Sequence, residues 1–406
     1  MRFPAAVLSI GDEVLKGSVL NTNAAFLGKN LSELGFEVVT HTVCPDSEEA
    51  IRFQIGELFR RVDLVIMCGG LGPTPDDVTR EGVASYYHAP LVFSEKQYGR
   101  LRLLYRRFRK KIPRLVRREA FYPANAKPLL NRFGIALGFF IERQGKVAVA
   151  LPGVPAELEN MFRDVVRPVL RKYFPSVRPH HQLIVKLTGI PEPEVMKRLG
   201  KDFFDDCFEF GIYPFPGEVM VRIYADTPSV ISRLRRKIAA RLGNFIYAWD
   251  DLSLAQVVGG ILTQKKRTLA VAESCTGGLL AAEIAGFAGT SCFLKGGIVA
   301  YDAEIKEKLG ICPEIIRRKG EVSAEVAGDL ALKVKTRMNA DYGIGITGIA
   351  GPGGGSPRKP VGLVYIGLSG PKGRPQVREY RFWGDRNQVR RRSVIKALEN
   401  LWRSLL

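Results

Sequence analysis

The chain has 406 residues, enough for about two or three domains with cores of their own, and its composition is that of an ordinary globular protein. No apolar run approaches the roughly 20 residues of a membrane-spanning helix, and the N-terminus lacks the apolar region and cleavage site of a signal peptide. We therefore expect a soluble, cytoplasmic protein with no membrane partner.

The formal net charge is +20 and the pI is near 9.8, so the surface should attract phosphorylated ligands and, non-specifically, nucleic acid. The densest positive charge lies in residues 100–118, where arginine and lysine alternate with leucine and aromatic residues. This segment is either a nucleic-acid patch or the solvated face of an amphipathic helix broken at Pro113, and the second interpretation is favoured. Nucleic acid is therefore a candidate partner but not the expected one.

The six cysteines are scattered and form neither a CxxC motif nor a cluster with histidine, which argues against zinc and against a disulfide framework. The four histidines all lie at or before position 181. A serine nucleophile in the C-terminal half would therefore need a base other than imidazole.

The predicted elements divide the chain into three parts. Residues 1–170 alternate strands and helices, which indicates a largely parallel sheet covered on both faces. Residues 171–250, which begin with a linker around 175–182, contain a smaller α+β module, and α/β alternation resumes in residues 251–406. The expected fold class is α/β, with two three-layer α/β/α domains joined by that module. Strands are predicted at 5–11, 36–43, 63–70, 146–153, 182–189, 217–225, 268–274, 295–301, 342–351, 362–370 and 377–384, and helices at 21–35, 47–62, 155–174, 191–200, 229–243, 277–287, 323–338 and 387–402.

In the N-terminal domain, polar and glycine residues follow two predicted strands. Ligands bind at the carboxyl ends of strands in open parallel sheets, and glycines let backbone amides approach phosphate. Acidic residues in these loops could hold a divalent cation, but for each acid taken singly a helix N-cap is the favoured interpretation, a role that suits Asp76 or Asp77 well. Neither a P-loop nor a GxGxxG motif is present. The residues concerned are Glu13, Gly70, Gly72, Thr74, Asp76, Asp77 and Thr79.

In the C-terminal domain, the stretch AESCTGG at 272–278 places Ser274 between a strand and a helix whose first amides could stabilise an oxyanion. A desolvated lysine can take a proton from a hydroxyl, so Lys306 is the candidate base. Tyr301 at a strand end and Lys306 in the next helix can converge. The stretch could also be only a small-residue turn, and Cys275 is a rival nucleophile.

A second glycine loop at 347–356 and arginines at the start of the last helix could complete this site. The guanidinium groups of Arg386 and Arg390 through Arg392 offer planar forks for a phosphate. The alternative for these arginines is a basic, solvated helix face.

Several blocks, in order across nearly the whole chain, resemble the CinA family, named for competence- and damage-inducible proteins. The N-terminal blocks GDEVLKGSVLNTN, GGLGPTPDDVTRE, NRFGIALGF and LPGVPAELENMF resemble its molybdopterin-binding-like domain. The block FGIYPFPGEVMVRI resembles its KH-type middle module, but it lacks the GxxG loop that clamps RNA. AESCTGG, GGIVAYDAEIKEKLG, GEVS, TGIAGPGGGSPRKPVGLVYIG and GDRNQVRR resemble its nicotinamide-nucleotide amidase domain.

The resemblance implies that the C-terminal domain hydrolyses the carboxamide of nicotinamide mononucleotide to nicotinate mononucleotide and ammonia, a salvage step that needs no metal. Ser274 would be the nucleophile, Lys306 its base and Tyr301 a proton-transfer partner, with Thr276 and Thr347 in the site. The substrate would be bound by Gly277, Gly278, Gly351, Gly353, Arg386 and Arg390.

For the N-terminal domain, the resemblance implies cleavage of the diphosphate of ADP-ribose with a divalent cation of the Mg or Co type. Asp77, Glu13 and Asp76 would be the metal ligands, and Gly70, Gly72, Thr74 and Thr79 would bind the substrate. Many members have threonine at the position of Asp12, and Leu137 replaces a usual proline. A homodimer is also implied. The alternative is a non-catalytic nucleotide- or pterin-binding protein, or a DNA-associated competence factor.

Overall fold

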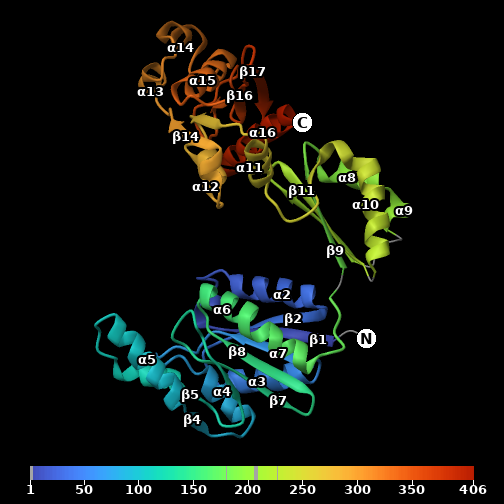
Figure 1. Cartoon of the computed structure of the whole chain (residues 1–406), viewed down its shortest axis with the longest axis vertical. Coiled ribbons are helices and arrows are strands. Elements are labelled where there is room, and N and C mark those ends of the chain that lie inside the picture. Colours follow the sequence, from blue (N-terminus) through green and yellow to red (C-terminus); the bar gives the residue numbers. More distant parts are fainter. Residues whose placement is uncertain (1–2, 180, 205–208, 226) are drawn as a thin grey trace. The chain divides into compact units, whose positions relative to one another are not determined.

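The computed structural model describes residues 3–179, 181–204, 209–225 and 227–406. The chain forms two compact units, Met1–His180 and His181–Leu406 (Figure 1). The α/β fold class is confirmed. His180, which belongs to the predicted linker, and Cys207, one of the six cysteines, lie outside the described residues. The three-part division of the chain stays a prediction.

Unit 1 is built on a six-stranded sheet in the order β2-β1-β3-β8-β7-β6. The four strands β2, β1, β3 and β8 are parallel, whereas β7 and β6 add antiparallel to that edge. The central strand β3 is buried along its whole length, as expected for a strand covered on both faces. The strands are β1 (Phe3–Ile10), β2 (Phe36–Cys44), β3 (Leu64–Cys68), β6 (Lys127–Leu129), β7 (Gly138–Arg143) and β8 (Lys146–Leu151).

Helices cover both faces of this sheet (Figure 1). One face packs against α2 (Thr22–Leu34), α6 (Pro155–Met161) and α7 (Arg167–Tyr173), and the other against α3 (Glu48–Phe59) and α4 (Thr79–Tyr86). A single π-helical turn joins α6 to α7, so the helix predicted at 155–174 is continuous. The remaining elements are α1 (Asp12–Leu15), β4 (Leu91–Phe93), α5 (Glu95–Arg107), the 3-10 turn η1 (Arg114–Ala120) and β5 (Phe121–Pro123).

Unit 2 contains two sheets. The smaller one is antiparallel, in the order β10-β11-β9-β12, and α8 and α10 pack on it. It fits the predicted α+β module. Its elements are β9 (His181–Thr188), α8 (Glu192–Leu199), α9 (Lys201–Phe204), β10 (Glu209–Phe215), β11 (Glu218–Ala225), α10 (Pro228–Leu242), the 3-10 turn η3 (Gly243–Phe245) and β12 (Ile246–Ala248).

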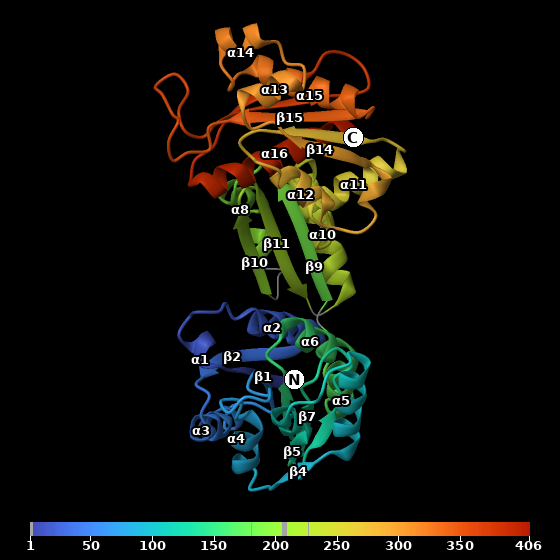
Figure 2. The ribbon, with the colours of Figure 1, turned by 90° about the vertical axis from the view of Figure 1, so that its left-hand side faces the viewer.

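The larger sheet of unit 2 has the order β14-β13-β15-β16-β17. Strands β14, β13 and β15 are parallel, and β16 and β17 continue antiparallel. One face packs against α11, α12 and α16, and the other against α15 and α14 (Figure 2). The elements are α11 (Leu254–Gln264), β13 (Leu269–Glu273), α12 (Leu279–Ala285), the 3-10 turn η4 (Thr290–Cys292), β14 (Leu294–Val299), α13 (Ala303–Lys308), α14 (Pro313–Lys319), α15 (Ala324–Arg337), β15 (Tyr342–Gly348), β16 (Leu363–Ser369), β17 (Gln376–Arg381) and α16 (Arg386–Leu405).

Every strand and helix predicted from the sequence overlaps an element of the same type. The sequence analysis missed the strands β7 and β10, whose residues show little alternation of buried and exposed side chains, and it missed the helices α11 and α14. The helix expected to carry Lys306 is present as α13. Its helix broken at Pro113 is also inexact, because α5 already ends at Arg107.

Candidate active site

Ser274 lies directly after β13, at the carboxyl end of a parallel strand. Its backbone N–H donates to the carbonyl of Ile346 on β15 over 2.9 Å, and its side chain is 8% exposed. On the other side, the Ala300 N–H donates to the Glu273 carbonyl over 2.7 Å. These bonds place Ser274 between the ends of β14 and β15, and no hydrogen bond to its hydroxyl is found in the described part of the chain.

The turn from Ser274 into α12 leaves backbone donors free. Gly277 (φ 58°) and Gly278 (φ 89°) adopt left-handed conformations, which glycine reaches at little cost. Among the described residues, the N–H groups of Cys275, Thr276 and Gly278 donate to no backbone carbonyl. The turn beside Ser274 therefore has backbone N–H groups without a carbonyl acceptor, which is the kind of donor that an oxyanion needs.

The first amides of α12 itself are not free. The carboxylate of Glu273, which is 1% exposed, accepts the N–H groups of Leu280 over 2.9 Å and Ala281 over 2.8 Å. This buried anion at the helix N-terminus fixes the turn that carries Ser274. Sequence reasoning did not single out Glu273.

Lys306 is buried, with 1% of its side chain exposed, on the one-turn-and-a-half helix α13. Its Nζ donates to the Tyr301 carbonyl over 2.8 Å and to Oε2 of Glu321 over 2.6 Å. Glu321 also links to the neighbouring strand, because its carbonyl accepts the Thr347 hydroxyl over 2.8 Å. Lys306 and Thr347 are thus connected through one residue, although no hydrogen bond joins Lys306 to Ser274.

Arg386 connects two of the predicted site segments. Its Nη1 donates to the Gly351 carbonyl over 2.7 Å and its Nη2 to the Tyr301 hydroxyl over 2.9 Å. The Tyr301 side chain is 54% exposed, and a Cβ built at Gly353 would meet open space. Tyr301, Gly351 and Arg386 therefore form one accessible rim.

Arg390 reaches back to the serine turn. Its Nε and Nη2 donate to the Thr276 carbonyl over 3.3 and 2.8 Å. The Thr276 hydroxyl is buried without a partner in the described structure, so it is available to a bound group. Arg391 pairs with Glu283 over 2.6 Å, so these arginines are not merely a solvated helix face.

Cys275 is a poor nucleophile in this arrangement. It belongs to the hydrophobic core, and burial raises the pKa of its thiol to about 12. Because the thiolate is the reactive form, such a thiol is inert near neutral pH.

We expect Cys275→Ala to leave any release of ammonia from nicotinamide mononucleotide close to the wild-type rate, and to fold with a modest loss of stability. The measurement is ammonia release by wild type and variant, with and without a thiol-alkylating reagent at neutral pH. A rate abolished by Cys275→Ala in a folded protein would make Cys275 the nucleophile instead.

In unit 1, the predicted phosphate loop after β3 is held together by its own polar residues. The Thr79 hydroxyl donates to the Gly69 carbonyl over 2.8 Å, and the Asp77 Oδ2 accepts the Thr74 N–H over 2.9 Å. A Cβ at Gly72 would lie 2.5 Å from that carboxylate. Asp77 therefore closes a turn, and neither it nor Asp76 caps α4, whose N-cap is Val78.

Two arginines that the sequence analysis did not assign to the site clamp the same loop. Arg80 is 1% exposed and donates from Nη1 to the Gly72 carbonyl over 3.2 Å and from Nη2 to the Leu71 carbonyl. Arg118 donates to the Thr74 carbonyl over 2.6 Å and to the Asp77 carbonyl over 3.1 Å.

Acidic residues gather after β1. Burial raises the pKa of the Asp46 carboxyl, and the nearby charges of Glu13, Asp12 and Asp76 raise it further, against a hydrogen bond from the Asp12 N–H. Among the described residues, however, no group of three or more His, Cys, Asp or Glu side chains is placed to hold a metal ion. Because Asp77 is also engaged with Thr74, these residues do not form an assembled cation site, and we derive no step through a metal ion.

A cavity of about 100 Å³ lies between the ends of β1 and β3. Glu13, Asn21, Asn23 and Gly69 line it, and the Oδ1 atom of Asn23 is buried without a partner in the described structure. This cavity sits where the topology predicts a ligand, at the carboxyl ends of adjacent parallel strands.

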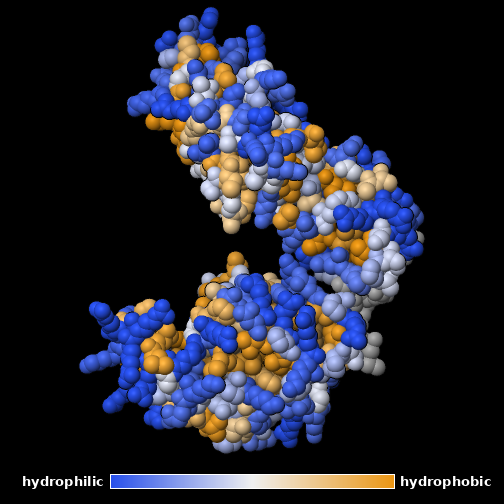
Figure 3. Space-filling view, in the orientation of Figure 1, coloured by the Kyte–Doolittle hydropathy of each residue, from blue (hydrophilic) through white to orange (hydrophobic). Residues whose placement is uncertain are grey.

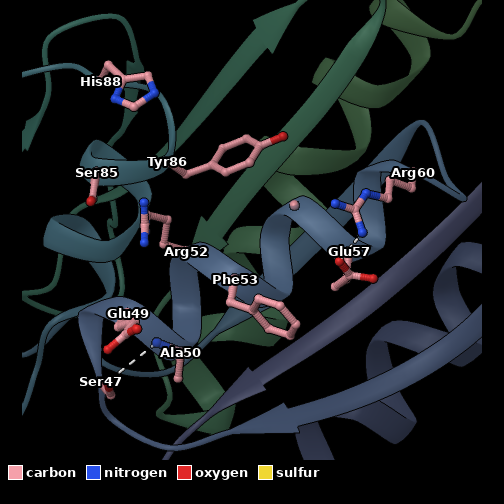
Figure 4. Close-up of a pocket in the computed structure, with 11 residues that line it drawn as sticks. Ser47, Glu49, Ala50, Arg52, Phe53, Glu57, Arg60, Ser85, Tyr86 and His88 are labelled. Carbon is pink, nitrogen blue, oxygen red and sulfur yellow. Dashed lines mark hydrogen bonds and ion pairs between the residues drawn. The ribbon is translucent and has the colours of Figure 1, made fainter.

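A larger hollow on unit 1 lies elsewhere. A shallow groove of about 580 Å³ runs between α3 and α4, with Phe53, Arg52, Tyr86 and His88 along it (Figure 4). No residue predicted for either site lines it.

Comparison with known proteins finds two family models, each over a part of the chain. A family model described as "CinA C-terminal domain" matches residues 251–405, and one described as "Probable molybdopterin binding domain" matches residues 6–172. A competence-damage inducible protein of Moorella thermoacetica is 40% identical over 99% of this chain and 98% of its own length. A CinA-like protein of Dictyoglomus thermophilum is 37% identical, with 98% of each chain covered.

Solved structures match shorter stretches. The protein CinA from Thermoplasma acidophilum is 32% identical and covers 41% of this chain and 98% of that chain, with a TM-score of 0.38. A competence/damage inducible protein from Agrobacterium tumefaciens is 36% identical, covers 37% and 93%, and has a TM-score of 0.37.

The class of protein is therefore defined by two α/β domains. The N-terminal one is molybdopterin-binding-like, and the C-terminal one is of the CinA type. The chain belongs to the CinA family. No comparison reports the KH-type label for the middle module. No helix in the described parts of the chain is long and apolar enough to cross a membrane.

Proposed function

We propose that unit 2 is an amidohydrolase that converts nicotinamide mononucleotide to nicotinate mononucleotide and ammonia. The observation that carries the proposal is the unengaged hydroxyl of Ser274 beside free backbone amides, with a buried lysine in the adjoining segment. This combination suits serine–lysine acyl transfer, and family membership agrees with it.

In the proposed first step, the Ser274 hydroxyl attacks the carboxamide carbon and its proton passes to Lys306 in the neutral amine form. The amides of Cys275, Thr276 and Gly278 hold the oxyanion, and Lys306 returns the proton to the leaving nitrogen as ammonia departs. In the second step, water attacks the acyl ester under the same base, giving the carboxylate and free Ser274. The sum is amide plus water to carboxylate plus ammonia.

The ion pair in the structure sets a condition on this mechanism. Lys306 donates to Glu321 and to the Tyr301 carbonyl, and no hydrogen bond joins its Nζ to Ser274 in the described structure. For the proposed step, Nζ must leave these two partners and turn toward Ser274 when the substrate carboxamide enters. Arg386 and the Thr276 hydroxyl are the groups that would orient the nucleotide.

The test is ammonia release from nicotinamide mononucleotide, measured without added metal for wild type and Ser274→Ala. We expect release by wild type and a rate at least about 1000-fold lower for the variant, as for loss of a nucleophile. Equal rates would remove Ser274 from the chemistry. If neither of the two folded proteins releases ammonia, the amidase proposal is rejected and a binding role remains for unit 2.

For unit 1 we propose nucleotide binding at the cavity after β1 and β3. Its glycine loop, its position at the strand ends and the unpaired Asn23 Oδ1 support this. Cleavage of ADP-ribose with a divalent cation is a more specific proposal for the same cavity. It goes beyond nucleotide binding, because the acidic side chains of the described structure are not arranged as a set of metal ligands. Calorimetric titration with ADP-ribose, with and without Mg²⁺, tests binding, and phosphate-product analysis tests cleavage.

A further inference from the structure

The basic segment, residues 100–118, is fixed to unit 1 at both ends. Arg100 donates from Nη2 to the Gly134 carbonyl over 2.6 Å, and Arg118 donates to the Thr74 carbonyl over 2.6 Å. Leu101 and Val116 are buried and tie the segment to the domain. The segment is therefore an ordered part of unit 1 with one inner and one outer side.

The outer side carries unpaired positive charge. In the described structure, eight exposed cations of this segment have no carboxylate within ion-pair distance; one of them, Arg117, lies over the Phe93 ring, and the other seven have no ring contact either. Glu95 is the nearest acid before the segment in sequence. Like charges so close repel one another, so the arrangement costs stability unless an anion covers it. The seven are Arg102, Arg106, Arg107, Arg109, Lys110, Lys111 and Arg114.

Large apolar side chains stand among these cations. Leu103 and Phe108 are each 65% exposed and Leu115 is 55% exposed. Figure 3 shows hydrophilic side chains projecting around α5 with hydrophobic surface between them. Exposed apolar groups are common singly, but three within one strongly cationic segment indicate a partner that takes up both kinds of group.

The composition of the segment distinguishes between anionic partners. From Arg100 to Arg118 there is no Ser, Thr, Asn, Gln or Gly, only cationic residues, apolar or aromatic ones and one proline. Nucleic-acid surfaces use polar side chains and stacking aromatics beside their cations, and exposed leucines add nothing there. A second copy of the segment would bring the same positive charges.

We propose that the basic segment binds the surface of a bilayer that contains anionic lipids. The seven cations meet lipid phosphates, while Leu103, Phe108 and Leu115 enter the boundary between headgroups and acyl chains. Such peripheral attachment needs no membrane-spanning helix. It revises the expectation from the sequence that the protein has no membrane partner, and it is independent of the amidase proposal.

The test is co-sedimentation of the full-length protein with vesicles of equimolar phosphatidylglycerol and phosphatidylcholine, or of phosphatidylcholine alone. Two variants separate charge from insertion. The first, Arg106→Gln, Arg107→Gln, Lys110→Gln and Lys111→Gln, should weaken binding to anionic vesicles by about 100-fold or more. The second, Leu103→Ser, Phe108→Ser and Leu115→Ser, should weaken it by at least about tenfold.

A matched control loses four exposed cations elsewhere on unit 1: Arg61→Gln, Arg143→Gln, Arg171→Gln and Lys172→Gln. It should bind within about threefold of wild type if the segment is the site. The same proteins are titrated with a single-stranded DNA oligonucleotide. The proposal is supported if the wild type and the control bind to anionic vesicles and both segment variants lose this binding.

Any of three results overturns it: no binding to anionic vesicles, equal loss in the control, or full retention by the serine variant. Tight DNA binding without vesicle binding would also overturn it and make the segment a nucleic-acid surface. Ammonia release by the variants should stay at the wild-type level, because the segment lies outside unit 2.

Discussion

Lys306→Met should abolish the proposed amidase activity, with kcat lowered by about 1000-fold, the range for loss of a general acid–base group. Methionine has a similar length and no charge, so it can fill the buried channel of the lysine stem. The partner left behind, Glu321, has 44% of its side chain exposed and stays hydrated, so the loss of the ion pair should not unfold the domain. The measurement is steady-state ammonia release together with a circular dichroism spectrum of the folded variant.

Lys306→Arg separates a base from a mere positive charge. Arginine can hold the charge and the bond to Glu321, but it does not lose its proton near neutral pH. We expect it to be as inactive as Lys306→Met, with substrate binding largely kept. An Arg variant with near wild-type kcat would show that position 306 acts by charge alone and would contradict the proposed proton transfer.

Glu119→Gln should change the pH dependence of stability in unit 1. Glu119 is 1% exposed, and both of its carboxylate oxygens are buried without partners in the described structure. Burial raises the pKa of this carboxyl to about 7, opposed by Arg80 and reinforced by Glu157 and Asp77. In the unfolded chain the same group titrates near 4.5.

The folded state therefore binds more protons than the unfolded state between these two values. The contribution of the protonated Glu119 carboxyl to the free energy of unfolding is complete below about pH 4.5 and is lost as pH rises toward 7. The loss amounts to about 3 kcal/mol above pH 7, from about 1.4 kcal/mol per pKa unit. Glutamine cannot ionise, so the free energy of unfolding of Glu119→Gln should rise by that amount relative to wild type between acidic and alkaline pH. Any cost of burying the amide is the same at both pH values and does not change this difference.

The measurement is the rate of hydrogen exchange of peptides from unit 1 at pH 5 and at pH 8. At each pH, the rate of the wild type is divided by the rate of Glu119→Gln. The ratio cancels the intrinsic pH dependence of exchange. We expect it to rise by at least tenfold between the two pH values, and to stay constant for the control Glu57→Gln, whose carboxylate is exposed and pairs with Arg60. A constant ratio for Glu119→Gln as well would mean that Glu119 is ionised and solvated in the folded protein.

The sequence predicted the elements that carry the sites because strand-ending glycines and amphipathic helices are local signals. The turn at 274–278 was read from its small residues and is a left-handed glycine turn in the structure. Local pattern did not identify the partners of these residues. Glu321 lies 15 positions from Lys306, and only the fold brings its carboxylate to the ammonium.

Burial of charge was also beyond sequence reasoning. Arg80 and Glu119 belong to strongly charged stretches that resemble solvated surface, yet both are buried behind the glycine loop. Asp77 was expected to bind a metal ion or to cap a helix; the N-cap of α4 is Val78, and the Asp77 carboxylate accepts hydrogen bonds from Thr74. Choosing among such roles requires the coordinates of neighbours that are distant in the sequence.

The most direct measurement is the trapping of the acyl-enzyme. Wild-type protein is mixed with nicotinamide mononucleotide, quenched in acid within the first turnovers, digested and analysed by mass spectrometry. We expect a nicotinate mononucleotide ester on Ser274 that is sensitive to hydroxylamine, is present in Cys275→Ala and is absent in Ser274→Ala. Ammonia release together with an adduct on a residue other than Ser274 would contradict this expectation. Ammonia release with no adduct in the wild type and no adduct in Cys275→Ala would contradict it as well.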